Sequence, residues 1–469
     1  MSYKLSLDAI RDKFKFTSSI RHNPKTELEL LPYNTKFKDN QYDFREVTGE
    51  FIRLIGQKQL NEKETVNTDE LINNVLDAIE FEKPPQRSEF KQMLKTLFVD
   101  ENNQLYLFHP QTLYYINTVE NENKKLATFL FNVLWMNEEP WSMDNDVTHS
   151  DLMSALLFKS LPQLSTSTKR PKNYSNIIPT ISDLFIKDFK WLATKSDLFT
   201  NQIEKIISYY YFLYVSQFAR RNEILFKPIE QEIQPVYFTF EGEERLSKTR
   251  VSYEFGWKSI ERAINQTFAH VNFLKMINFT ESTSSDSKNN DLLSYQQIAN
   301  QVESMSTEEQ LELEQQVEQL IEEYKENLSG DIKWELLGTF HASSNIPVLK
   351  KLDSFFHIID YQFNQSSRAK PYNEFKQWFV HFCQKSFLKS RGRSGKMLIL
   401  DTDYLLFLTK LMIKDEPKIR LKNLFSEFET RGMIFDRDTQ TAIVDYFEKL
   451  NLLEKKSDSG DAIYVKAFL

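Results

Sequence analysis

The sequence predicts a mostly α-helical protein with several domains, and three observations support this fold class. The chain has 469 residues, which at about 150 residues per domain suggests about three domains. Only 10 Gly and 14 Pro occur, so the residues that interrupt helices and form tight turns are scarce. Apolar residues make up 41% and charged residues 27% of the chain, a composition that can bury several hydrophobic cores.

Charge and cysteine content exclude several classes of protein. Cys383 is the only cysteine, so one chain can form neither a disulfide framework nor a cysteine-rich zinc site. Residues 1–16 lack the uninterrupted apolar stretch of a signal peptide or a membrane span, and we expect a cytoplasmic protein. The net charge of -8 argues against nucleic-acid binding over the whole surface, so any DNA contact must be local.

Changes in composition divide the chain into five predicted regions. A β hairpin made by two short apolar runs, 97–99 and 105–108, is expected in an otherwise helical N-terminal region. In the second region, 201–221 predicts a buried core helix, because its apolar block of about 12 residues is too short to cross a bilayer. The predicted regions are 1–165, helical with the hairpin; 172–280, helical; 281–305, a flexible linker; 306–385, helical with a long acidic helix; and 386–469, a basic tract and the C-terminal domain.

The acidic helix is predicted to begin after Ser306. Ser306 and Glu309 have the spacing of a capping box, in which the two side chains satisfy backbone amides at the start of a helix. Apolar residues follow at intervals of four and three up to a stop near Gly330, namely Leu313, Val317, Leu320, Tyr324 and Leu328. Most other positions carry Glu, so the helix packs its apolar stripe either on its own domain or on a partner protein.

Residues 402–469 predict three short helices followed by two strands. Pro417 ends the first helix, Gly432 ends the second, and Asp436 is a suitable N-cap for the third. The strands 452–456 and 462–467 flank a turn at 457–461. This order of elements predicts a winged-helix domain, a helix-turn-helix variant whose third helix can enter a major groove. The apolar faces of the three helices are Tyr404, Leu405, Leu408, Leu411 and Met412; Leu421, Leu424, Phe425 and Phe428; and Ala442, Ile443, Tyr446, Phe447 and Leu450.

Candidate nucleic-acid-binding residues lie in three places of this C-terminal region. The outward face of the third helix offers polar groups only at its N-terminal end, whereas Asp445 and Glu448 would oppose phosphate. The tract 389–396 is basic and rich in Gly and Ser, which suits either a phosphate-binding arm or a solvated linker. Because winged helices also dock on proteins, DNA contact and protein contact both remain open. The candidates are Thr439 and Gln440 on the third helix, Lys455 and Lys456 on the wing, which is the hairpin of the two strands, and Lys389, Arg391, Arg393 and Lys396 in the tract.

No motif predicts a catalytic site, a cofactor or a metal. The tract 389–396 resembles a Walker A loop only superficially, because the glycine spacing is short and Met397 replaces the hydroxyl that holds magnesium. The seven histidines lack metal-ligand spacing, and Glu-x-Lys occurs three times without a supporting context. Cys383 and the aromatic run 209–212 are expected to be buried. The sequence therefore favours a protein that is not an enzyme.

Three segments resemble the DptG (DndG) family of bacterial DNA phosphorothioation-dependent restriction systems. They are LPYNTKFKDNQYDFREVTGEFIRLI, RGRSGKMLILDTDYLLFLTKL and, most specifically, RGMIFDRDTQTAIVDYFEKLNLLEKKSDSGDAIYVKAFL. The resemblance implies an antiviral-defence assembly, the DndFGH complex, that attacks DNA lacking phosphorothioate marks. It implies DptF and DptH (DndF and DndH) type partners, in which ATPase and helicase-like functions reside, and no catalytic residues in this chain.

The leading expectation is a non-enzymatic subunit that bridges these partners and contributes to binding double-stranded, unmodified DNA. Two alternatives belong to other classes. One is a winged-helix transcriptional regulator, which would bind an operator by itself, and the acidic third helix argues against it. The other is a docking subunit of a chromosome-organising ATPase.

Overall fold

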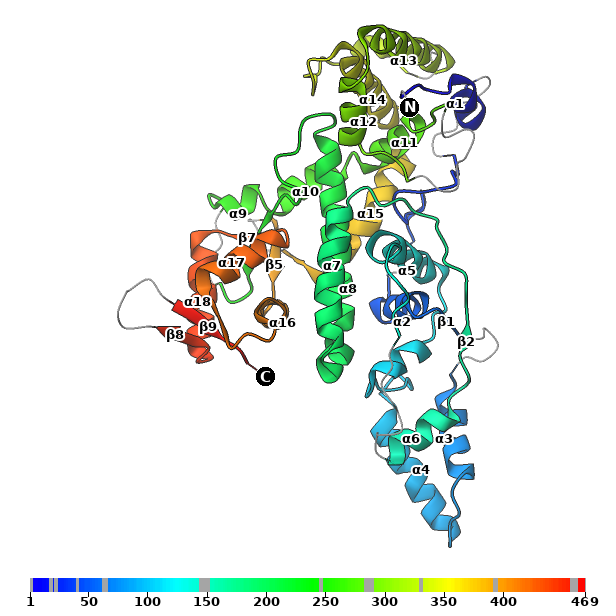
Figure 1. The fold of residues 1–469 in the computed structure, drawn as a ribbon, viewed down its shortest axis with the longest axis vertical. Coiled ribbons are helices and arrows are strands. Elements are labelled where there is room, and N and C mark those ends of the chain that lie inside the picture. The colour runs from blue at the N-terminus through cyan, green and yellow to red at the C-terminus, as the bar shows by residue number, and fades with distance from the viewer. Residues whose placement is uncertain are drawn as a thin grey trace. The chain divides into compact units, whose positions relative to one another are not determined.

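The computed structural model describes residues 3–16, 20, 24–38, 42–60, 66–142, 152–243, 248–281, 291–328, 332–390, 395–455 and 463–468. These residues are mostly helical, as predicted, with small sheets (Figure 1). They form two compact units, each built from separate stretches of chain: Met1–Gln41, Asn173–Ile181 and Phe212–Leu469 in the first, and Tyr42–Lys172 and Ser182–Tyr211 in the second. None of the described helices combines the length and the apolar character that a membrane crossing requires.

The second unit is built around α2 (Phe44–Ile55) and α5 (Asn121–Leu134). α2 begins where the Asp43 carboxylate accepts hydrogen bonds from the amides of Arg45 and Glu46, which are otherwise unsatisfied at a helix start. Gly49 permits a close approach, because a Cβ there would lie 2.6 Å from Cβ of Ile116, just after η1 (Pro110–Tyr115). The second unit also takes in most of α7 (Pro179–Ala193) and the first part of α8 (Ser196–Glu223).

α8 confirms the buried helix predicted at 201–221. Its aromatic run, Tyr209 to Phe212, is at most 1% exposed, as expected for core residues. Within the second unit, the Tyr210 hydroxyl donates to the buried Asp188 carboxylate at 2.8 Å. This stretch of α8 is thus a core element, and its buried Tyr210 hydroxyl has a hydrogen-bond partner.

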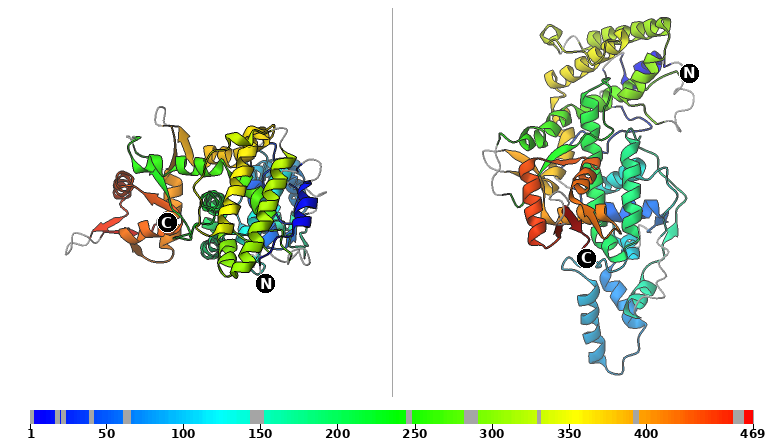
Figure 2. Two further views of the ribbon diagram at one scale, coloured as in Figure 1. Left: turned by 90° about the horizontal axis from the view of Figure 1, so that it is seen from above. Right: turned by 60° about the vertical axis from the view of Figure 1, so that its left-hand side comes forward.

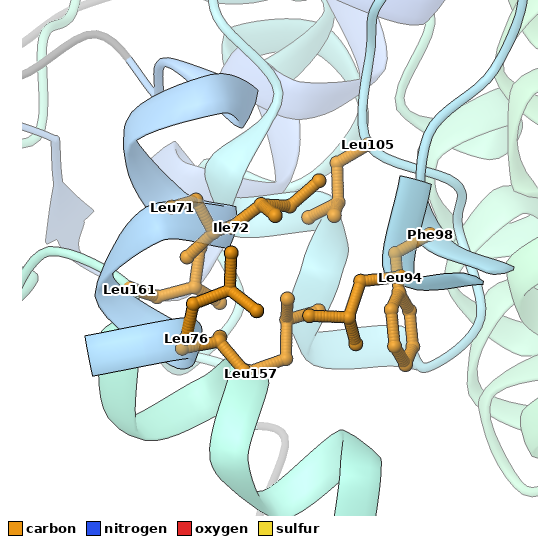
Figure 3. Packing of buried hydrophobic residues seen from close by; sticks show 9 residues of the cluster. Leu71, Ile72, Leu76, Leu94, Phe98, Leu105, Leu157 and Leu161 are labelled. Carbon is orange, nitrogen blue, oxygen red and sulfur yellow. The ribbon is translucent and has the colours of Figure 1, made fainter. Parts of the chain in front are cut away.

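A separate small core lies in the second unit among α3 (Thr68–Asp77), α4 (Pro84–Phe98) and α6 (Leu152–Ser160). Figure 3 shows leucines of all three helices pointing toward one another, with Leu105 and Phe98 closing one side. α4 begins with two prolines, which suit the first turn of a helix. Its buried residues Leu94 and Phe98, four apart, face this core, so the helix continues through Phe98.

The β hairpin predicted at 97–108 is therefore confirmed only in part, as a turn closed by one antiparallel bridge. Residues 97 and 98 end α4, and the strand pairing is limited to a single bridge between Val99 and Leu105. A short apolar run does not distinguish a strand from a helix end, and packing on the small core decides for the helix. A two-residue antiparallel pair, β1 (Lys58–Gln59) with β2 (Ser165–Thr166), was not predicted.

The helical part of the first unit contains the predicted acidic helix as α13 (Thr307–Asn327). The capping box of Ser306 and Glu309 is present, and Leu313, Val317, Leu320 and Tyr324 are buried. Figures 1 and 2 show α13 beside α14 (Pro347–Gln365), to which the Tyr324 hydroxyl donates at Gln362 Oε1, 3.0 Å away. The apolar stripe thus packs within its own unit, while most of the glutamates remain exposed or partly exposed.

Further helices complete this part of the first unit. The linker predicted at 281–305 was wrong for its second half, because α12 (Tyr295–Glu303) is a helix with a capping box of Ser294 and Gln297 and buries Tyr295, Ile298 and Val302. Residues 282–290 lie outside the described residues. The other helices of this part of the first unit are α1 (Leu7–Phe14), α10 (Trp257–Ile264), α11 (Thr267–Ile277), η3 (Trp334–Leu336) and α15 (Ala369–Ser386).

A four-stranded mixed sheet connects distant parts of the first unit. Its order is β4 (Leu388–Ser390), β5 (Lys396–Leu400), β3 (Val236–Phe240) and β7 (Met433–Phe435). β3 runs parallel to β5 and β7, with Thr239 opposite Ile399 and Phe238 opposite Phe435. β4 and β5 form an antiparallel hairpin, so the two ends of the basic tract 389–396 are strands rather than a linker.

The three helices predicted at the C-terminus are present as α16 (Thr402–Ile413), α17 (Leu421–Thr430) and α18 (Arg437–Lys449). Gly432 has a φ of +79°, the left-handed conformation predicted after the second helix. The two predicted strands are β8 (Leu453–Lys455) and β9 (Ile463–Lys466), while the turn between them lies outside the described residues. A third strand that was not predicted, β6 (Lys418–Arg420), gives a sheet of order β6-β9-β8.

Candidate nucleic-acid interface

The start of α18 is held by a buried charge network. Asp436 caps the helix, its carboxylate accepting from the Thr439 amide at 3.0 Å. The Arg250 guanidinium, which precedes α9 (Val251–Glu254), donates both to Asp436 and to Glu243, which follows β3. The side chains of Arg250, Glu243 and Asp436 are 8%, 5% and 13% exposed, respectively. The network therefore connects α18 to the mixed sheet away from water.

Thr439 belongs to this network, and its predicted place on the outward face of α18 was wrong. The residue is fully buried, its hydroxyl donates to Glu243 Oε1 at 2.8 Å, and Arg250 donates to it at 2.7 Å. A buried hydroxyl needs such partners, because leaving it unsatisfied costs free energy. Thr439 is therefore not accessible to a nucleic acid in this structure.

The network keeps the Asp436 carboxylate ionised. Burial of Asp436 opposes its ionisation, but hydrogen bonds from Arg250 and the Thr439 amide outweigh this effect and lower the pKa of Asp436 to about 2. A paired and hydrogen-bonded arrangement is the condition under which buried charges are tolerated. The start of α18 is thus fixed in place by charges that are not free to contact phosphate.

The exposed face of α18 carries mixed charge. Gln440 is partly exposed, and its amide donates to the Phe435 carbonyl at 3.0 Å. Asp445 and Glu448 are exposed, as predicted, and would repel phosphate. Arg437, in the first turn, is exposed and has no carboxylate partner among the residues that the structure describes.

The predicted cations differ in their surroundings. Lys389 pairs with Glu241 at 3.0 Å, and Lys455 pairs with Glu448 at 2.9 Å. Lys396 is exposed at the start of β5, without a described partner. The remaining candidates, Arg391, Arg393 and Lys456, lie outside the described residues.

Sequence reasoning missed exposed cations of the C-terminal region, among them three at the starts of α17 and α18. Arg420 ends β6, Lys422 lies in the first turn of α17, and Arg437 follows the N-cap of α18. All three are exposed, and none pairs with a carboxylate in the described part of the chain. Arg437 could have been found from the predicted N-cap, since the next residue begins the helix. The place of Arg420 could have been predicted only together with β6, the strand that it ends.

Cys383 and His270 are core groups. Cys383 is buried, and burial raises the pKa of its thiol, which disfavours the nucleophilic thiolate. His270 is fully buried, stacks on Phe356 at 4.1 Å and shares a hydrogen bond with the Tyr295 hydroxyl. Two Glu-x-Lys sequences lie in α4 and α15, as expected. Among the described residues, no group of three or more His, Cys, Asp or Glu side chains has the arrangement of a metal site.

Comparison with known proteins assigns no family to the chain. No protein-family model matches it, and no curated protein matches it.

Proposed function

We propose that this chain is a non-enzymatic subunit of a phosphorothioation-dependent restriction assembly. In this role it bridges ATPase and helicase-like partners of the DptF and DptH type and helps to hold unmodified double-stranded DNA. The observation that supports the DNA part is the arrangement of 402–468, in which three helices accompany a β6-β9-β8 sheet. The restriction system and its partners are inferred from the resemblance of three sequence segments to the DptG (DndG) family.

The C-terminal arrangement fits a winged-helix domain. The helices α16, α17 and α18 precede the hairpin of β8 and β9, and the short β6 lies between the first two helices. In such a domain α18 is the recognition helix and the β8–β9 hairpin is the wing. The order of the sheet, with β9 between β6 and β8, places the wing beside the strand that leads into α17.

Charge favours a DNA contact at the edges of this domain. The exposed face of α18 carries Asp445 and Glu448, which disfavours deep insertion into a major groove. Arg420, Lys422 and Arg437 are exposed and pair with no carboxylate among the described residues, and the N-terminus of α17, which no side chain caps, also favours phosphate. A backbone contact of this kind positions DNA without reading its sequence.

Co-purification tests the subunit role. The tagged full chain, expressed with the genes encoded beside its own, is expected to retain an ATPase or helicase-like protein through washes at moderate salt. Absence of any such partner would overturn the proposal. Binding by the isolated chain to one palindromic operator would instead favour the regulator, and retention of a chromosome-organising ATPase would favour the docking subunit.

A further inference from the structure

The segment 251–258 displays apolar and aromatic side chains on the surface of the first unit. Phe255 is 57% exposed and Val251 is 46% exposed, and Tyr253 between them is partly exposed. Large apolar side chains in contact with water that cluster within five residues usually mark a binding surface. This segment lies in the described part of the chain, directly after Arg250 of the network at the start of α18.

The backbone that carries Phe255 is fixed. The Phe255 amide donates to the Val251 carbonyl at 3.0 Å, and its own carbonyl accepts from the Tyr237 amide of β3 at 3.2 Å. The next residue, Gly256, is pressed against this strand, because a Cβ there would lie 2.4 Å from the Ser252 carbonyl oxygen and 2.8 Å from that of Tyr237. Phe255 is therefore held on the surface by a rigid turn, which reduces the entropy lost when a ligand binds.

A cationic side chain lies next to the Tyr253 ring. The Lys258 ammonium lies 5.8 Å from the centre of the Tyr253 ring, and it also pairs with Glu254 at 2.6 Å. The start of the β5 strand lies against the same ring, since a Cβ on Gly395 would be 3.7 Å from Tyr253 Cε2 and Oη. The next residue, Lys396, is exposed and has no carboxylate partner among the described residues. The Tyr253 ring thus has a cation beside it and the start of β5 against it.

We propose that Phe255 and Tyr253 form a stacking site for the bases of an unpaired nucleic-acid strand, with Lys396 and Lys258 beside its phosphates. Bases stack on exposed aromatic rings irrespective of sequence, and nearby cations follow the phosphate backbone. The bases of intact duplex DNA are already stacked on one another, so the site selects single strands. This inference rests on the proposed DNA-binding function and adds a strand type to it.

The test compares two oligonucleotides of equal length with the full chain, one of thymidines and one of abasic nucleotides. The abasic strand keeps the phosphates and lacks the bases, so a stacking site binds the thymidine strand more tightly. Phe255→Ala is expected to weaken thymidine-strand binding about tenfold and to leave abasic-strand and duplex binding unchanged. Phe255→Trp is expected to retain binding, and Tyr106→Ala, at another exposed aromatic position (43% exposed), is the control.

Several outcomes would overturn the inference. They are equal wild-type affinity for the two strands, no effect of Phe255→Ala, or an equal loss of single-strand and duplex binding. A Phe255→Ala chain that binds the thymidine strand normally but loses a protein partner would make this surface a protein contact. Failure of the proposed function is distinguishable, because it removes duplex binding from the wild-type chain as well.

Discussion

At the residue scale, the connection between Arg250 and the start of α18 is the strongest polar feature of the C-terminal region. Arg250 lies 186 residues before Asp436 in the chain, and both side chains are largely buried. Removing one partner of a buried ion pair leaves the other charge uncompensated, whereas an exposed pair contributes little. This difference predicts unequal effects for two arginines of the same unit.

Arg250→Met is expected to lower the free energy of unfolding by about 3 kcal/mol, because Glu243 and Asp436 remain buried without a cation. Arg262→Met is the control, since Arg262 pairs with Glu223 while 73% exposed, and its loss should cost less than about 1 kcal/mol. Chemical denaturation of both variants measures the difference. Similar losses in the two variants would mean that the Arg250 network does not stabilise the fold.

His270 predicts a pH dependence of stability. Burial, with a smaller effect of His357, lowers its pKa to about 3, whereas an unfolded histidine titrates near pH 6.5. Between these values the unfolded chain binds the additional proton, so this residue lowers stability as the pH falls below about 6.5. Its contribution to the slope is at most about 1.4 kcal/mol per pH unit.

His270→Gln is therefore expected to flatten the decline of the unfolding free energy between about pH 6 and pH 4. The exposed His341, replaced in the same way, should leave the slope unchanged. Denaturation midpoints across this range provide the measurement. Parallel curves for the wild type and His270→Gln would show that His270 is not kept neutral by the fold.

Single residues with a local role were predictable, and those with long-range partners were not. Ser306, Asp436 and Gly432 were found because helix caps and stops depend on residues a few positions away. Thr439 was misplaced because its partners, Glu243 and Arg250, are 196 and 189 residues distant in the chain. Helical periodicity alone does not reveal which polar positions a distant element covers.

At the element scale, the turn between α17 and β7 depends on one glycine. Gly432 has a φ of +79°, and a Cβ at this position would lie 2.7 Å from Leu213 Cδ1 and 3.2 Å from Ile233 Cγ2. Both the backbone conformation and the space therefore disfavour a side chain. The turn directs the chain from α17 into the strand that pairs with β3.

Gly432→Ala is expected to lower the free energy of unfolding by about 1–3 kcal/mol through backbone strain and steric overlap. Gly338→Ala is the matched control, because no atom lies within 4 Å of the new Cβ. Thermal unfolding of the two variants tests this. An unchanged midpoint for Gly432→Ala would contradict the role of this turn.

Strongly periodic elements were predicted well, and short ones were not. α8, α13 and the three C-terminal helices follow from apolar spacing and from Gly, Pro and cap residues. α12 was missed because it follows a polar stretch, and the three-residue β6 because it is short and polar. The hairpin predicted at 97–108 is reduced to one bridge between Val99 and Leu105, because packing in the small core extends α4.

At the scale of the whole molecule, the chain order hides how the units are assembled. The Tyr3 hydroxyl donates to the Ile277 carbonyl, 274 residues further along, and both belong to the first unit. Composition and turn signals are local, so they divided the chain into five continuous regions. The structure instead assembles each unit from separate stretches.

The proposed contribution of the chain to holding double-stranded DNA is also a property of the whole molecule. Each phosphate contact made by a cation adds to the salt dependence of binding. Arg420, Lys422 and Arg437 are exposed and pair with no described carboxylate, so they should influence the affinity of the assembly for any duplex. Lys83, Lys350 and Lys370 are exposed cations in other elements and allow a matched change of charge.

The most direct test is the duplex affinity of the complete assembly, measured against salt for two triple variants. Replacing Arg420, Lys422 and Arg437 by Glu is expected to weaken binding at least tenfold and to reduce the slope of log Kd against log salt by about 2–3. Replacing Lys83, Lys350 and Lys370 by Glu should change neither quantity substantially. Equal affinities and slopes for both variants and the wild type would contradict DNA binding through the C-terminal region.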